Sequence, residues 1–137
     1  MKEQGLNAVK KKSGTNNASP AFSKFTLSVS LLRTENQNVI LGCAAWKNRI
    51  NIEDTLFAGA VINKIGKHFS INCDSSQIAL SMYNEAKGDM FQFMRSKKAS
   101  HYQRLAGFGL EKDINYCLTA DIANTTVIYE EGKLVAK

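Results

Sequence analysis

Glu53 and Asp54 are the two residues of this sequence whose types and placing most readily suggest chemistry. They follow an apolar run from Val39 to Ala44 that is typical of a buried strand, and they open a stretch with helical periodicity. In open α/β sheets, the loop after a strand's carboxyl end faces the ligand crevice, and the next helix offers unpaired N–H groups. Two carboxylates at that point either cap the helix and complement its dipole or hold a metal ion.

The elements on either side of this acidic pair decide where it lies. A continuous apolar run is typical of a strand buried on both faces, and therefore of a parallel or mixed sheet covered by helices. After the loop, Asn51 can cap a helix that runs to about Lys67, with Asp54 at the third position to complete a capping box. Gly59, between two alanines, permits close approach of another backbone. The expected apolar stripe of this helix consists of Leu56, Ala60, Val61 and Ile65.

The segment before the strand can be interpreted in two ways. Ser19 and Pro20 indicate a helix start, and Phe22, Phe25, Val29 and Leu32 then fall close to one helical face. The alternation of apolar residues over 25–31 instead allows a strand. We prefer the helix, ending near residues 33–38.

Further helices and a terminal hairpin follow the acidic pair. We expect helices from Asp74 or Ser75 to Gly88, over the stretch DMFQFMRSKK, from a Ser100 cap to Gly107 or Gly109, and from Asp113 to Leu118. Residues on both sides of Glu131 and Gly132 predict a hairpin. The order of elements predicts an α/β fold of the three-layer α/β/α type with a small mixed sheet. Because one buried strand and one hairpin are few for such a sheet, either the 25–31 segment adds a strand or the sheet is an incomplete version that residues outside this chain complete.

Composition and charge restrict the class of protein. The 137 residues suffice for one domain, and 44% hydrophobic and 22% charged residues are usual for a globular protein. No apolar run is long enough to cross a bilayer, and no signal peptide is visible, so we expect a cytoplasmic protein without a membrane partner. Half of the net charge of +6 comes from residues 1–19, which we expect to be a disordered basic tail before a single domain over 20–137. Nucleic-acid binding is therefore disfavoured.

Three cysteines are widely spaced, and their pattern predicts no catalytic or metal-binding role. Cys43, Cys73 and Cys117 show neither zinc-site spacing nor a CxxC pair. Their apolar surroundings predict buried free thiols in a reducing compartment.

Several segments together resemble a known family. They are NVILGCAAWKNRINIEDTLFAGAVI, SHYQRLAGFGLEKDINYCLTADI and VIYEEGKLV. In order and spacing they resemble the C-terminal half of 2-phosphosulfolactate phosphatase, over about residues 38–137. Ala45 departs from the family pattern, which has glycine there, and a proline near the terminal strand is missing at 126–128. The family's N-terminal motifs are not found, so the chain looks like a truncated member.

The resemblance implies a magnesium-dependent phosphatase of the coenzyme M biosynthetic route, which converts 2-phospho-3-sulfolactate to 3-sulfolactate and phosphate. Glu53 or Asp54 would then bind Mg²⁺, and His101 could act as an acid. Because this substrate carries phosphate, sulfonate and carboxylate groups, cations must hold it. Lys47, Arg49 and Arg104 are the candidates. The alternatives are a catalytically incomplete fragment that acts as a binding or assembly module, and a surface position for His101. We also expect a homo-oligomer.

Overall fold

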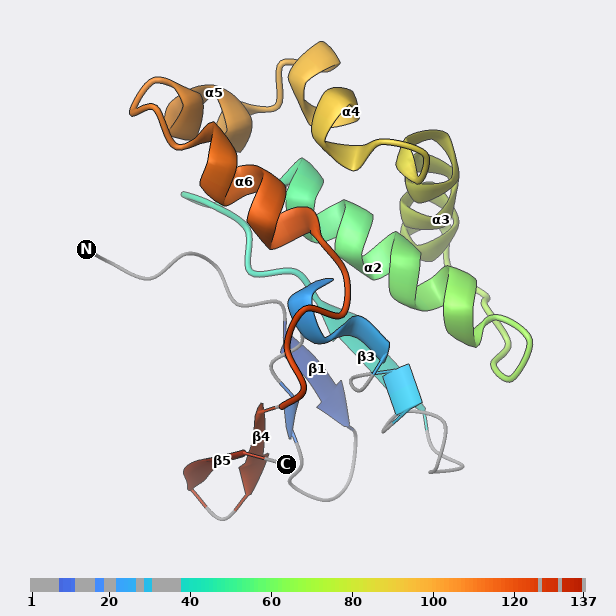
Figure 1. Ribbon diagram of the computed structural model, residues 1–137. Helices are drawn as coiled ribbons and strands as arrows, with labels where there is room; N and C mark the ends of the chain where they lie inside the picture. The colour runs from blue at the N-terminus through green and yellow to red at the C-terminus, as the bar shows by residue number, and fades with distance from the viewer. Residues whose placement is uncertain are drawn as a thin grey trace.

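The computed structural model describes residues 8–11, 17–18, 22–26, 29–30, 38–125, 127–130 and 132–136. In Figure 1 the helices gather on one side of the strands, so the part of the chain described here has two of the three expected layers. The α/β class is confirmed, because helices and a small sheet make up the described chain. Within the described residues, no helix is long and apolar enough to cross a bilayer.

Five strands form one sheet in the order β3-β1-β2-β4-β5, and all of its pairings are antiparallel. The expectation of a mixed sheet was therefore wrong for these strands. Among the described strands, β3 lies at the edge of the sheet and pairs with β1, and its residues are alternately half-buried and exposed. The strands are β1 (Ala8–Lys11), β2 (Asn17–Ala18), β3 (Val39–Gly42), β4 (Val127–Glu130) and β5 (Lys133–Ala136). The predicted terminal hairpin is confirmed by the pairing of β4 with β5.

β1 and β2 lie inside the segment that the sequence predicts to be a disordered tail, so that prediction is wrong for residues 8–11 and 17–18. The physical reason is that β3 and β4 supply backbone hydrogen-bond partners, which hold a strand whatever its side-chain composition. The other residues of the predicted tail lie outside the described part of the chain.

The helices follow the predicted order closely. After η1 (Phe22–Lys24) they are α2 (Ile52–Ile65), α3 (Asp74–Ala86), α4 (Met90–Ser96), α5 (Ser100–Ala106) and α6 (Glu111–Leu118). Ser100 is not the cap of α5, because Ala99 occupies the cap position and no side chain caps this helix. The three cysteines are free but exposed, which corrects the expectation of buried thiols. Cys43 and Cys73 lie just outside β3 and α3, and Cys117 lies on α6 next to the exposed Tyr116.

Helix α2 is the centre of the core, since nine of its fourteen residues are buried. The predicted apolar stripe is buried throughout, and Leu56 has no exposed surface. Gly59 lets α3 approach: a Cβ there would lie 2.1 Å from the carbonyl oxygen of Ala79. The predicted close approach of another backbone at this glycine is therefore confirmed.

The segment before β3 is helical where it is described, as we preferred. Phe22 and Val29 are buried, and the Phe22 ring packs edge-to-face on Phe57 of α2 with centroids 5.1 Å apart. This segment is tied to the chain after α6. The Asp121 carboxylate accepts hydrogen bonds from the backbone N–H and the hydroxyl of Thr26, both 2.7 Å long.

Replacing Gly59 by alanine tests the packing of α2 on α3. We expect Gly59→Ala to lower the free energy of unfolding by about 1–3 kcal/mol or more, because the added methyl group meets a backbone oxygen that cannot move alone. Urea denaturation followed by circular dichroism measures the change. Gly88→Ala is the matched control, since a Cβ there meets nothing within 4 Å. Equal stability of both variants would contradict the close approach.

Candidate active site

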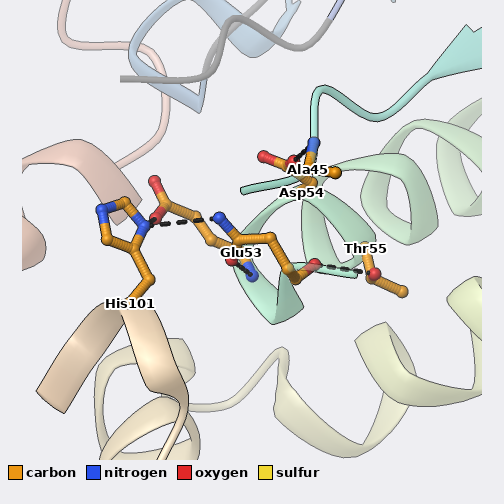
Figure 2. A network of polar contacts seen from close by, with 6 residues as sticks. Ala45, Glu53, Asp54, Thr55 and His101 are labelled. Carbon is orange, nitrogen blue, oxygen red and sulfur yellow. Dashed lines mark hydrogen bonds and ion pairs between the residues drawn. The ribbon is translucent and has the colours of Figure 1, made fainter. Parts of the chain in front are cut away.

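The amino end of α2 is built on the Asn51 side chain. Its Oδ1 accepts a hydrogen bond of 3.0 Å from the Glu53 N–H, and its backbone carbonyl accepts one of 2.9 Å from the Thr55 hydroxyl. The predicted helix cap is therefore confirmed. The capping box is not formed, because Asp54 Oδ2 accepts a hydrogen bond of 2.9 Å from the Ala45 N–H instead (Figure 2).

Asp54 is a buried carboxylate, with 3% of its surface exposed. Burial raises its pKa above the ordinary value of 3.8, and the charge of Glu53 acts in the same direction. The hydrogen bond from Ala45 and the proximity of His101 oppose that rise. Asp54 therefore secures the loop after β3 to the start of α2, and it is turned away from solvent.

Glu53 points the other way, toward α5. Its Oε2 lies 2.6 Å from His101 Nδ1, with 25% of the Glu53 side chain and 10% of the His101 side chain exposed (Figure 2). Because the carboxylate only accepts, Nδ1 carries the proton in this contact. Within the described residues, the buried Nε2 of His101 has no hydrogen-bond partner. This is the environment of an imidazole held in one orientation by its Nδ1, and it argues against a surface histidine.

The positively charged residues Lys47 and Arg49 of the loop belong to a tight turn with two central residues. Trp46 and Arg49 exchange backbone hydrogen bonds of 3.0 and 2.9 Å. Between them, Lys47 and Asn48 have φ angles of 50° and 60°, the left-handed values that a type I′ turn requires. Asn48 tolerates this conformation, whereas for Lys47 it costs about 1–2 kcal/mol. This turn was not predicted from the sequence, in which Asn48 is the only local signal for it.

One pocket brings the predicted cations together. It has a volume of about 400 Å³, and its wall includes Lys47, Arg49, Arg104 and His101. The Arg104 guanidinium lies over the Trp46 ring, 4.5 Å from its centroid. Trp46, Ile50, Asn51 and Ser100 complete the lining, and of these the sequence analysis gave none a ligand-binding role. Glu53 and Asp54 are not among the lining residues, and Glu53 contacts the wall at His101.

The fit of Mg²⁺ to these residues depends on Glu53. Among the described residues, no three His, Cys, Asp or Glu side chains are grouped as metal ligands. Asp54 is buried and already accepts from Ala45, whereas the contact of Glu53 with His101 uses only Oε2. Mg²⁺ is often held by one or two carboxylates, waters and the substrate phosphate, and Glu53 fits the role of one such carboxylate.

Comparison with known proteins gives a consistent result. A family model described as 2-phosphosulpholactate phosphatase matches residues 9–132. A protein of Thermotoga petrophila named "Probable 2-phosphosulfolactate phosphatase" is 27% identical over 117 residues, which cover 85% of this chain and 49% of that protein. A protein of Synechocystis sp. with the same name is 32% identical over 95 residues, 67% of this chain and 39% of that protein. The chain thus spans about half the length, or less, of these curated relatives.

The buried Asp54 carboxylate predicts a specific dependence of stability on pH. Since its pKa is raised in the folded protein, the folded state holds this proton more tightly than the unfolded state. The resulting stabilisation is present below pH 3.8 and is lost as the pH rises through the raised pKa. We expect the free energy of unfolding of the wild type to fall over this interval relative to Asp54→Asn, which keeps an acceptor for Ala45.

Urea titrations at several pH values from about 4 to 7 measure this difference. Asp113→Asn removes an exposed carboxylate from α6 and serves as the control. If the two variants diverge from the wild type equally with pH, the burial of Asp54 is not the cause.

Proposed function

Because this chain belongs to the 2-phosphosulfolactate phosphatase family, as the match over residues 9–132 shows, we propose that it takes part in hydrolysis of a phosphate monoester. Membership confirms the resemblance found in the sequence. We further propose that the substrate is 2-phospho-3-sulfolactate, in a reaction of the coenzyme M route. The cytoplasmic location and the homo-oligomer stay predictions.

The observation that carries this proposal is the cationic pocket. Lys47 and Arg49 from the turn face the same cavity as Arg104 from α5. In the described part of the chain, none of these three side chains is within ion-pair distance of a carboxylate, since the ion pairs found are Lys97 with Glu85 and His101 with Glu53. Charges that lack an internal partner are available for a ligand with several negative groups.

His101 is the group that would handle a proton. Glu53 holds its Nδ1, so the ring orientation and tautomer are set, as in the orienting role of a carboxylate beside a catalytic histidine. Nε2 is left without a protein partner among the described residues. In the proposed reaction, a water molecule attacks phosphorus and forms a new P–O bond while the ester P–O bond breaks. The imidazolium form of His101, which carries a proton on each ring nitrogen, donates the Nε2 proton to the leaving alkoxide oxygen.

We also propose that Glu53, rather than Asp54, contributes the carboxylate for Mg²⁺ on this chain. Its side chain is partly exposed, whereas Asp54 is buried. When bound, the metal ion would neutralise charge on the transferred phosphoryl group. Lys47, Arg49 and Arg104 bind the anionic groups and orient the ester in either case.

An assay of inorganic phosphate released from 2-phospho-3-sulfolactate with magnesium tests the roles directly. We expect His101→Asn and Glu53→Gln each to lower kcat about 10²–10⁴-fold, because both disturb proton donation. Arg49→Ala and Arg104→Ala should raise KM. Arg95→Ala removes an exposed arginine of α4 that lies outside the pocket and should change neither constant. Full activity of both Glu53→Ala and Asp54→Ala would reject the acidic pair.

A second candidate function is a catalytically incomplete binding or assembly module. It is favoured by the coverage of about half of each relative's length. This hypothesis predicts that the chain binds inorganic phosphate but releases none from the ester, and that it associates with another polypeptide. Size-exclusion chromatography with light scattering measures the association, and a monomer that turns over substrate would exclude the module.

A further inference from the structure

We propose that Trp46 is a positioning residue for ligand binding: its indole ring fixes the Arg104 guanidinium at the pocket wall, ready for an anion. This inference rests on the proposed function, in which the pocket binds an anionic ester. It assigns a ligand-positioning role to Trp46, for which neither the sequence pattern nor the family membership gave one.

The first observation is the contact itself. The Arg104 guanidinium lies 4.5 Å from the centroid of the Trp46 ring, and both residues line the same cavity. Trp46 is 40% exposed, so its ring is not a core side chain. Arg104 has no carboxylate partner among the described residues, and its guanidinium lies over the indole face instead.

The second observation concerns the backbone of Trp46, which belongs to a hydrogen-bonded turn. Two hydrogen bonds between Trp46 and Arg49 close the turn that carries Lys47. Trp46 therefore joins the two walls of the pocket, because its backbone shapes the wall with Lys47 and Arg49 while its ring holds Arg104 of the other wall. A change in the ring would alter Arg104 without opening the turn.

The chemistry of arginine explains why such a contact would help binding. A guanidinium that stacks on an aromatic face keeps the N–H groups of its edge free for a bidentate anion. A side chain that is already ordered loses less rotamer entropy when the ligand arrives. Lysine at position 104 would keep the charge but would lose the planar guanidinium over the ring and its paired donors.

Isothermal titration of the chain with inorganic phosphate tests this role without requiring turnover. We expect Trp46→Leu to raise the dissociation constant about 3- to 30-fold, Trp46→Phe to restore most of the affinity, and Arg104→Lys to weaken binding. In an Arg104→Ala background, Trp46→Leu should have no further effect, because its influence passes through Arg104. Additive losses in that double variant, or unchanged affinity of Trp46→Leu, would overturn the inference.

The outcomes separate this inference from the proposed function. If the wild type fails to bind phosphate, the cationic pocket is not an anion site and the proposed function fails with it. If the wild type binds but Trp46 substitutions have no effect, only the positioning role fails. Arg95→Ala controls for the loss of one positive charge.

Trp46 is the only tryptophan of the chain, and its fluorescence offers a readout that needs no substitution in the ring. We expect phosphate to change the emission of the wild type and not that of Arg104→Ala. An equal response from both proteins would contradict coupling between the ring and the guanidinium. This measurement remains decisive if Trp46→Leu fails to fold.

Discussion

The cap of helix α2 by the Asn51 side chain is the interaction on which the rest of the site depends. A helix that is buried along most of its length must satisfy its first N–H groups locally, and Asn51 does so for Glu53. With the cap in place, successive side chains of the first turn diverge by about 100°. Glu53 is thereby directed to α5, and Asp54 to the loop after β3.

This divergence gives the two carboxylates different tasks. Asp54 stabilises a loop in which Ala45, Lys47 and Asn48 all adopt left-handed backbone angles, a conformation that non-glycine residues hold only when their surroundings impose it. Glu53 orients His101 across the gap between two helices. Residues of the loop and of α5 then line one cavity, and both segments contact the first turn of α2.

The positive charges of the pocket explain why the loop and α5 must be held in place by other contacts. Lys47, Arg49 and Arg104 repel one another, and the described chain supplies no carboxylate beside them. Their arrangement is held by the turn, by the Trp46 ring and by α5 rather than by ion pairs. The proposed anion would bind to such a site without first breaking ion pairs, which is the advantage of a pre-organised scaffold.

The sequence alone determined the local features of this protein. The Asn51 cap, the buried stripe of α2, the helix order and the terminal hairpin are set by residue type and spacing, because helix caps, periodicity and turn residues act over a few positions. The family resemblance also required nothing more than the order of short motifs, and it named Lys47, Arg49, Arg104 and His101 as separate candidates.

Only the tertiary structure decided how these features combine. The contact of Glu53 with His101, the hydrogen bond from Ala45 to Asp54 and the cation–π contact of Arg104 with Trp46 join residues that are 48, 9 and 58 positions apart. The strands at residues 8–11 and 17–18 likewise exist because other strands pair with them. Each of these outcomes depends on how α2, α5 and the strands pack, and no local pattern of residues specifies that packing.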